Sequence, residues 1–513
     1  MNGAEALVRT LVGAGVEVCF TNPGTSELHF VAALDRIEGM RPILTLFEGV
    51  ASGAADGYAR MAEKPASTLL HLGPGLANGL ANFHNARKAR SPVVNLVGDH
   101  ATLHQRYDAP LSADVEAFAR PVSAWVRSAP EPGAVAELGA EAVAAARKPP
   151  GGVATLVVPA DVAWSEGARP APAREPAKRD TVAPAAIAEA AEALRSGERC
   201  ALLVSGPALR ASGLTLARRI ADASGALLFC DTFNTRLERG AGRVAIQPLP
   251  YFAEAALAAL EGVRHLILVG TQAPVAFFAY PGKPIELWPA DCAVRELAGR
   301  ADDAEAALEV LAEELGAPAD VPTQARLKPE PPTGPLNPAA IGASLGALLP
   351  EGAIVSDEAI TAAAALFPGT VGAAPHDWLY LTGGAIGQGL PVATGAAVAC
   401  PDRKVVCLEG DGSAMYTIQS LWTQAREGLD VTTVILANRS YAILQIELQR
   451  LGLEQPGQRA VDMLSIGRPD LDFVALARGM GVAASRATTA DEFHAQLGAA
   501  LAEPGPHLIE AFY

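Results

Sequence analysis

The chain has 513 residues, of which half are apolar and 19% are charged, and its formal net charge is −16 at pH 7. This length is too great for one hydrophobic core and predicts about three domains. The acidic balance, with no stripe of Lys and Arg, argues against a nucleic-acid partner. No apolar run reaches the ~18 residues that span a bilayer, and the first residues lack the pattern of a signal peptide. We therefore expect a cytoplasmic protein with no membrane partner.

Six cysteines are scattered along the chain, mostly within or beside apolar runs, and no two of them form a CxxC pair. This distribution is typical of reduced thiols in the core of a cytoplasmic protein, and it predicts neither disulfides nor a zinc site.

Two proline-rich stretches interrupt the periodic pattern of the chain, at residues 165–184 and 322–338. Both are typical of extended surface linkers. They divide the chain into predicted domains at residues 1–165, 185–320 and 339–513.

Each of these segments alternates short Val, Ile and Leu runs with Ala-rich stretches. This alternation predicts an α/β protein in which each domain is a doubly wound parallel sheet. The expected strands are, in chain order, residues 16–20, 43–47, 67–72, 93–97, 154–158, 201–204, 226–230, 265–269, 353–356, 404–408, 432–437 and 508–511.

In the first segment, three candidate site residues follow expected strands. Thr25 lies in the loop after strand 16–20, Glu48 directly follows the run 43–47, and His71 opens the loop 71–79. Loops at the carboxyl edge of a parallel sheet are where ligands bind, and burial there favours the protonated form of a carboxyl group. Two plainer interpretations remain: Glu48 as a glutamate at a helix entrance, and His71 as a packed histidine bonded to a carbonyl.

The middle segment offers no comparable group of residues. The loop at 204–209 has no GxGxxG pattern and no acidic residue at the distance expected for a dinucleotide site. We therefore expect no dinucleotide there.

The third segment contains a strand at 404–408, the run Gly410-Asp411-Gly412-Ser413, and a second strand that ends before Asn438. In a βαβ unit, Asp411 and Asn438 end at the same edge of the sheet. A carboxylate, an amide oxygen and a loop carbonyl suit Mg²⁺, whose other positions would go to phosphate oxygens and water. The glycines let backbone N–H groups approach a phosphate. The alternative is an ordinary βα turn with an unrelated Asn.

Two further stretches of this segment are candidates for a ligand. The glycine-rich run 381–391 contains Gly384 and Ile386, although a glycine-rich turn that caps a helix would look similar. The run 356–361 follows a strand and opens a helix, so Thr361 lies at the carboxyl edge as well.

These patterns resemble those of thiamine-diphosphate enzymes over essentially the whole chain. The GDG run, a helix, a strand and then Asn resemble the family's metal signature, and 381–391 resembles its GGLGxxLP stretch. FEGxxxGAADGYARM, at 47–61, resembles the glutamate region of acetohydroxyacid synthase large subunits and benzoylformate decarboxylase. The loop at 71–79 combines the GPGxxN of the synthases with a histidine of the decarboxylase. One departure is Ala437, where the family usually has a first Asn.

The resemblance implies thiamine diphosphate and Mg²⁺, with pyrimidine-binding, central and diphosphate-binding domains. Glu48 would pass a proton to the pyrimidine, while His71 would handle protons at the substrate and Thr25 would contact its carboxylate. The metal ligands would be Asp411, Asn438 and the Ser440 carbonyl. The remaining cofactor contacts would be Gly384, whose carbonyl accepts from the 4′-amino group, Ile386 beneath the cofactor, and Thr361, Gly410, Gly412, Ser413, Tyr441 and Ala442. We expect no FAD, because the loop at 204–209 lacks a dinucleotide-binding pattern and the chain is shorter than typical FAD-binding synthases.

The implied function is cleavage or formation of a C–C bond on a 2-oxo acid, a small-molecule substrate that the sequence does not identify further. The enzyme would be an acetolactate-synthase-like lyase (decarboxylase) or transferase (carboligase). The alternative is a non-catalytic homologue that acts as a regulatory or interaction subunit. The family also implies a homodimer or homotetramer with its active sites at the subunit interface.

Overall fold

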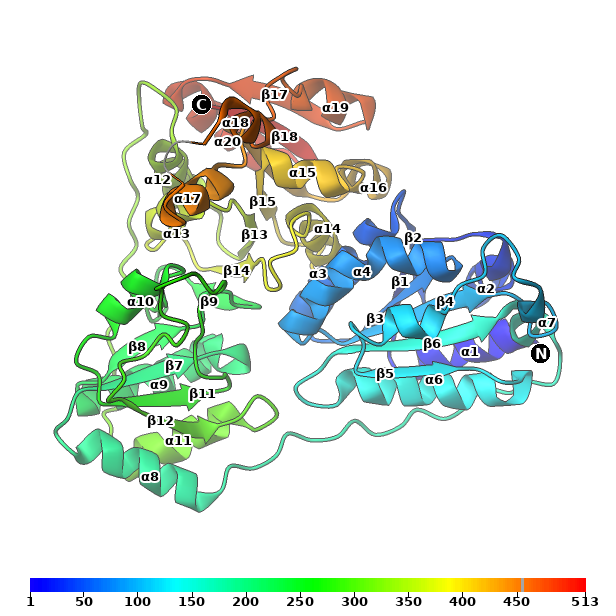
Figure 1. Cartoon of the computed structure of the whole chain (residues 1–513), viewed down its shortest axis with the longest axis horizontal. Helices are drawn as coiled ribbons and strands as arrows, with labels where there is room; N and C mark the ends of the chain where they lie inside the picture. Colours follow the sequence, from blue (N-terminus) through cyan, green and yellow to red (C-terminus); the bar gives the residue numbers. More distant parts are fainter. Residues whose placement is uncertain (454–455) are drawn as a thin grey trace.

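Three separate β-sheets organise the chain in the computed structural model, which describes residues 1–453 and 456–513. Figure 1 shows them as three lobes, with the N-terminal lobe at the right and an extended segment running below it toward the middle lobe. The parallel α/β architecture predicted from the alternating pattern is confirmed. None of the described helices is long and apolar enough to span a bilayer.

The first sheet has six parallel strands in the order β2-β1-β3-β4-β6-β5. All five strands expected in this segment are present, with ends shifted by a few residues; the additional β5 is short and partly exposed. Its strands are β1 (Val18–Asn22), β2 (Arg41–Leu44), β3 (Ala66–Leu70), β4 (Val93–Asp99), β5 (Trp125–Ser128) and β6 (Val153–Pro159). Its helices are α1 (Gly3–Gly13), α2 (Leu28–Arg36), α3 (Glu48–Ala62), α4 (Leu72–Ala89), α5 (Val115–Ala119), α6 (Pro132–Arg147) and α7 (Ala160–Trp164).

The second sheet has five parallel strands in the order β10-β8-β7-β11-β12. Its strands are β7 (Cys200–Val204), β8 (Leu227–Cys230), β10 (Gln247–Pro248), β11 (His265–Val269) and β12 (Ala293–Ala298), and its helices are α8 (Pro184–Arg195), α9 (Ala211–Ser224), α10 (Ala253–Ala259) and α11 (Ala304–Glu314).

The third sheet has seven strands in the order β17-β18-β16-β15-β13-β14-β9. Its strands are β9 (Leu237–Arg239), β13 (Ala353–Glu358), β14 (His376–Tyr380), β15 (Val405–Gly410), β16 (Val431–Ala437), β17 (Ala483–Ala487) and β18 (His507–Phe512). Its helices are α12 (Pro338–Leu348), α13 (Ala363–Gly369), α14 (Gly389–Ala399), α15 (Asp411–Thr417), α16 (Ser420–Glu427), α17 (Ala442–Arg450), α18 (Gln458–Met463), α19 (Phe473–Gly479) and α20 (Ala490–Ala502).

One strand of this third sheet comes from the middle segment. β9 pairs antiparallel with β14, whereas the other pairs of the sheet are parallel. A strand of three residues leaves no periodic signal in a sequence. The domain limits 1–165, 185–320 and 339–513 stay a prediction. β9 lies within 185–320 but pairs with the third sheet, so these limits do not match the sheets completely.

The helices next to the candidate site begin earlier in the chain than the sequence predicted. β2 ends at Leu44, so Glu48 is the first residue of helix α3 and not the end of a strand. His71 is the N-cap of α4, so most of the loop expected at 71–79 is helical. Pro74 does not prevent this, because the N–H that it lacks has no intrahelical partner in the first turn. Likewise, Asp411 opens helix α15.

Helices α3 and α14 join the first and third lobes through very close contacts between their backbones. A Cβ added at Gly57 would lie 2.1 Å from the Val392 carbonyl oxygen, and one at Gly395 would lie 1.9 Å from the Ala54 oxygen. The small residues within 47–61 are thus explained by the close packing of α3 against α14. The contact fixes the helix that carries Glu48 against the segment that follows the glycine-rich loop.

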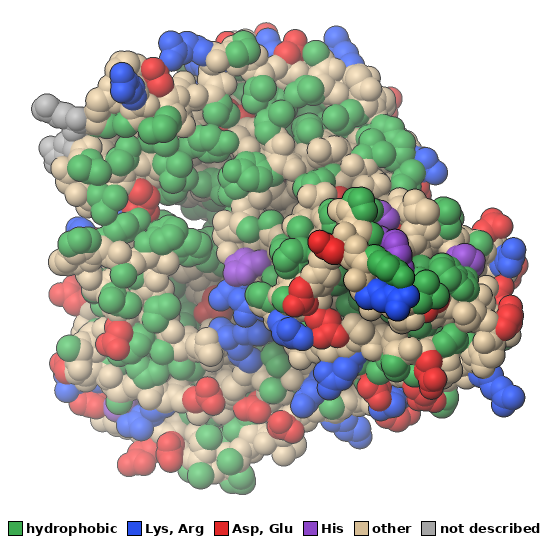
Figure 2. Space-filling model, turned by 45° about the vertical axis from the view of Figure 1, so that its right-hand side comes forward, with side chains coloured by type: hydrophobic (Ala, Val, Ile, Leu, Met, Phe, Trp, Pro, Cys, Tyr) green, Lys and Arg blue, Asp and Glu red, His purple; other side chains and the backbone are tan. Residues whose placement is uncertain are grey.

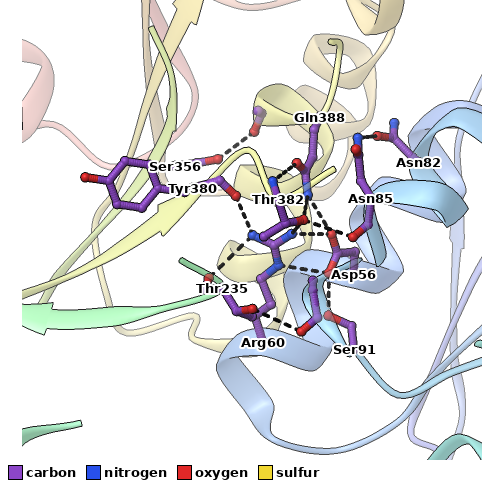
Figure 3. Close-up of polar contacts among 12 residues, drawn as sticks. Asp56, Arg60, Asn82, Asn85, Ser91, Thr235, Ser356, Tyr380, Thr382 and Gln388 are labelled. Carbon is purple, nitrogen blue, oxygen red and sulfur yellow. Dashed lines mark hydrogen bonds and ion pairs between the residues drawn. The ribbon is translucent and has the colours of Figure 1, made fainter. Parts of the chain in front are cut away.

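A buried ion pair reinforces the same junction (Figure 3). Arg60 donates to both carboxylate oxygens of Asp56, at 2.8 and 2.6 Å, and both side chains are fully buried. Arg60 also donates to the Tyr380 carbonyl at 2.8 Å and to Thr382 Oγ1 at 3.0 Å. Gln388 Nε2 donates to Asp56 at 2.7 Å. The network therefore links helix α3 to both ends of the glycine-rich loop.

We expect Arg60→Ala to destabilise the protein by about 3–5 kcal/mol, because it leaves Asp56 as an uncompensated buried charge. Calorimetry should show the unfolding transition of these domains lowered by roughly 10 °C. Arg36→Ala is the matched control: its pair with Glu5 is exposed, so its loss should cost under about 1 kcal/mol. Equal shifts for the two variants would contradict this account.

A buried histidine makes stability depend on pH. His376, at the start of β14, is 4% exposed, and burial, with Arg239 nearby, lowers its pKa from 6.5 to about 4. Between these values the unfolded chain binds a proton that the folded chain does not, so stability falls as the pH drops from 6.5 to 4. The loss is roughly 3 kcal/mol when complete. Denaturation of His376→Gln and wild type across this range should show a smaller acid-induced loss for the variant.

Candidate functional site

Glu48 is held by two asparagine side chains at the carboxyl edge of the first sheet. It is 7% exposed. Asn22 Nδ2, at the end of β1, donates to Oε1 at 3.2 Å, and Asn78 Nδ2, in α4, donates to Oε2 at 3.0 Å. The carboxyl group is thus fixed in position by elements far apart in the sequence. The sequence assigned no role to either asparagine, although Asn78 is the Asn of the GPGxxN pattern.

His71 lies beside Glu48, on the other side of Gly75. A Cβ added at Gly75 would lie 3.3 Å from Glu48 Oε1 and 3.4 Å from His71 Cβ. The structure therefore brings together the two residues that the sequence proposed as acids of the first segment. The glycine keeps open the space between them.

The His71 ring contacts a carboxylate and a hydroxyl, not the carbonyl of the plainer interpretation. Its Nδ1 lies 2.8 Å from Glu27 Oε2 and 3.3 Å from Ser26 Oγ. Thr25 is exposed, and its neighbour Ser26 makes the contact with the histidine. The role of Thr25 stays a prediction. Ser26 and Glu27 follow Thr25 in the same loop, and their contact with His71 was not predicted, because it joins two segments that are far apart in the sequence.

The carboxyl edge of the third sheet carries the candidate metal ligands. β15 and β16 are parallel, with Gly410 opposite Leu436, so Asp411 and Asn438 follow neighbouring strands at the same edge. Asp411 Oδ2 accepts from Arg439 N at 2.6 Å, and Asn438 Oδ1 accepts from Ser440 N at 3.0 Å. The structure thus brings the three predicted ligands together.

This donor set fits Mg²⁺ that is also bound to a diphosphate. Burial raises the pKa of Asp411, and N–H groups of Arg439 and Gly412 only partly oppose that effect, so a cation would stabilise its ionised form. Within the described part of the chain, no cluster of three His, Cys, Asp or Glu side chains could hold a metal. One carboxylate, one amide and one carbonyl leave room for phosphate oxygens, as Mg²⁺ requires.

The residues around Asp411 shape the rest of this edge. Tyr441, the N-cap of α17, places its ring where a Cβ at Gly412 would be, at 2.5 Å. Ser413 is buried in α15, Ala442 opens α17, and Thr361 lies partly buried just before α13. All are at the edge predicted for them, and their contacts with a cofactor stay a prediction.

A buried glutamate clamps the glycine-rich loop. Glu358, at the end of β13, accepts from the backbone N–H groups of Gly387, Gln388 and Gly389 at 2.5–2.7 Å. Burial raises its pKa to about 7. From the first lobe, Asn85 Nδ2 donates to the Ala385 carbonyl at 2.7 Å. Sequence reasoning included Glu358 in the run 356–361 without a role, and nothing in that run shows that it reaches the loop.

The clamped loop contains Gly384 and Ile386, both partly buried. Gly384 has a φ of 76°, which only glycine adopts readily. The Phe277 ring lies 2.5 Å from where its Cβ would be. A side chain at position 384 is therefore excluded on both grounds.

A cavity of about 640 Å³ lies between the first and middle lobes, and Thr382 of the glycine-rich run is among its lining residues. Its lining includes Lys88, Arg90 and Arg300, and burial followed by the charge of Arg300 lowers the pKa of Arg90. Figure 2 shows Lys and Arg side chains gathered near the centre of one face of the molecule. Neither Glu48 nor Asp411 lines this cavity. The expected absence of FAD stays a prediction.

Comparison with known proteins gives the family. A model of the thiamine pyrophosphate enzyme N-terminal TPP-binding domain matches residues 1–118, and one of the C-terminal TPP-binding domain matches residues 363–511. Relatives include the "Putative acetolactate synthase large subunit IlvX" of Mycobacterium tuberculosis, 57% identical over 99% of this chain and 98% of that protein. Another is benzoylformate decarboxylase of Pseudomonas aeruginosa, 32% identical over 97% and 96%.

Among solved structures, the thiamine diphosphate-dependent 4-hydroxybenzoylformate decarboxylase of Rhodococcus jostii is similar. It aligns over 100% of this chain and 99% of its own, with a TM-score of 0.87 and 25% identity. The matched domains carry Glu48 on one side and Asp411 and Asn438 on the other. This chain belongs to the thiamine pyrophosphate enzyme family.

Proposed function

We propose that the protein uses thiamine diphosphate and Mg²⁺ to cleave or form the C–C bond beside the carbonyl of a 2-oxo acid. One arrangement carries this proposal: Glu48 is fixed between Asn22 and Asn78, and Asp411 and Asn438 follow neighbouring strands at the same edge of the third sheet. A non-catalytic homologue would have no need to keep both halves of such a site.

The cofactor would supply a carbon nucleophile for the ketone and a sink for the electrons left by CO₂. Glu48 would exchange a proton with the pyrimidine ring, as the positioned acid–base group. Asp411, Asn438 and the Ser440 carbonyl would hold Mg²⁺ against the diphosphate. Gly384 and Ile386, on the clamped loop, would fix the bend of the cofactor, which acts by proximity.

His71 would hold or move a proton at the substrate. Its side chain lies next to Glu48, but its Nδ1 contacts Glu27 and not Glu48. The two residues would therefore serve different atoms, Glu48 the pyrimidine ring and His71 the substrate. Thr25 would contact the substrate carboxylate from the neighbouring loop. The relatives include a protein named as an acetolactate synthase and two decarboxylases, which supports both ligation and simple decarboxylation as outcomes.

The test is to load the protein with thiamine diphosphate and Mg²⁺ and offer a panel of 2-oxo acids with small, branched and aryl side chains. CO₂ release identifies the substrate, and mass spectrometry separates an aldehyde from a ligated 2-hydroxy ketone product. Reactions without cofactor or with a chelator are the controls. No CO₂ from any acid would contradict the proposal.

We also propose that two copies complete the site. Apolar side chains are exposed beside both halves: Leu46, two residues before Glu48, is 48% exposed, and Met415 and Tyr416, on the helix that Asp411 opens, are 40% and 52% exposed. Burial of such residues against a second copy would be favourable.

Analytical ultracentrifugation of the loaded protein should therefore show a dimer or tetramer. Because the exposed side chains are apolar, Leu46→Asp with Tyr416→Asp should weaken the assembly and lower activity together. A fully active monomer would contradict this expectation.

A further inference from the structure

We propose that Glu27 is a positioning residue that keeps a proton on His71 Nδ1 and thereby presents Nε2 to the substrate. The proposal rests on the proposed function, in which His71 moves a proton. It adds a residue to which sequence reasoning gave no role. Glu27 is 0% exposed, while the side chain of His71 is 24% exposed.

The hydrogen bonds around Glu27 select the tautomer of the histidine. Glu27 Oε2 lies 2.8 Å from His71 Nδ1 and accepts from Gly24 N, also at 2.8 Å. A carboxylate only accepts hydrogen bonds, so the proton between Glu27 and the ring belongs to Nδ1. Ser26 Oγ, 3.3 Å from the same nitrogen, can also accept from it.

The other ring nitrogen is then the one that reacts. Among the described residues, none makes a hydrogen bond to His71 Nε2, and the ring is partly exposed. The group bonded to one nitrogen of an imidazole determines the form of the other. Nε2, which is bare in the neutral ring, can therefore take up a proton from solvent to give an imidazolium and pass that proton to the substrate, while the Nδ1–H bond to Glu27 stays intact.

The cap that Glu27 forms in its own turn does not by itself require a carboxylate. It caps Gly24 N within the turn formed by residues 25–27, and a glutamine would make the same capping bond. Its Oε1 is buried and has no partner in the described structure; it lies 1.7 Å from where a Cβ at Gly98 would be.

A buried carboxylate with an unmade hydrogen bond is costly. Within the described residues, only His71 lies at ion-pair distance from Glu27. A carboxylate in this position orients an imidazole and stabilises the positive charge that forms on it during proton transfer. Glu27 is thus placed to stabilise a positive charge on the His71 ring when that ring accepts a proton.

The direct test reads the tautomer by ¹⁵N NMR of the full-length holoenzyme with labelled histidine, in which His71→Gln identifies the His71 signals. We expect a neutral Nδ1–H ring in the wild type. Glu27→Ala removes the acceptor, so the Nε2–H form should become dominant. Glu27→Gln should keep Nδ1–H, because its amide oxygen can still accept, and Ser26→Ala is the matched control that should also keep it. An Nε2–H ring in the wild type, or an unchanged tautomer in Glu27→Ala, would overturn the proposal.

The kinetic test separates this role from that of Glu48. Glu27→Ala should lower kcat by ~10²-fold or more, within the range for a positioned proton donor, and Glu27→Gln by less. Both should leave exchange of the cofactor C2 hydrogen near the wild-type rate. A loss of exchange equal to the loss of turnover would overturn the proposal. If Glu27→Ala does not fold, Glu27→Gln decides through its ¹⁵N spectrum: an Nε2–H ring in that variant would overturn the proposal.

The two proposals fail in different ways. A wild type with the Nδ1–H ring that releases no CO₂ would overturn the proposed function, whereas the assignment of Glu27 to the tautomer of His71 would stand.

Discussion

Glu48→Gln should keep thiamine diphosphate bound but slow exchange of its C2 hydrogen for deuterium by several orders of magnitude. Glutamine has the size of glutamate and can still hydrogen-bond the pyrimidine ring. It cannot exchange a proton with that ring, and a positioned acid–base group is commonly worth ~10²–10⁴ in rate. Stopped mixing with D₂O followed by NMR of the released cofactor measures this exchange directly.

The surroundings of Glu48 show why binding should survive the substitution. Asn22 and Asn78 each donate to one carboxylate oxygen, so one of them would face the amide N–H of the glutamine. That asparagine can turn its own oxygen toward the new donor. The cost is therefore of the order of one hydrogen bond, about 1 kcal/mol, far less than the effect on the proton transfer.

His71→Ala is the matched comparison. It lies on the other side of Gly75 and contacts Glu27 through Nδ1. We expect it to leave C2 exchange nearly unchanged and to impair a later step that involves the substrate. If both substitutions slowed exchange equally, or if neither did, the roles assigned to the two residues would be wrong.

Much of this architecture could be predicted from the sequence, because parallel strands are buried on both faces and leave continuous apolar runs. Runs such as 93–97 and 265–269 correspond closely to β4 and β11. β9 and β10 could not be predicted, since strands of three and two residues have no period to detect. The early start of α3 was missed because Glu48 closes an apolar run.

The candidate site also has a part that could be predicted from the sequence and a part that could not. Asp411 and Asn438 lie close in sequence within one βαβ unit, so their meeting could be predicted from topology alone. The contacts of Glu27 with His71 and of Glu358 with the loop at 387–389 are made by side chains that reach across to another segment, and strand order does not predict them. Their geometry depends on the packing of whole domains, and a single sequence does not contain it.

Asp411→Ala should reduce the affinity for thiamine diphosphate in the presence of Mg²⁺ by more than the ~10–100-fold that loss of a group behind a metal ligand costs. Asp411 is the only carboxylate among the three predicted ligands, so its removal leaves Mg²⁺ with neutral protein oxygens alone. Arg439 N and Gly412 N would also lose their acceptor. Two effects therefore act in the same direction, one on the ion and one on the loop.

Two further variants separate these effects. Asp411→Asn keeps an oxygen for one of the backbone N–H groups but removes the charge, so we expect most of the affinity loss to persist. Asp402→Ala, an exposed substitution in the same domain, should bind as the wild type does. Titration calorimetry at several Mg²⁺ concentrations is the measurement. If Asp411 holds Mg²⁺ against the diphosphate, wild-type affinity should rise with Mg²⁺ and that of Asp411→Ala should not. Undiminished affinity in Asp411→Ala would contradict the metal site itself.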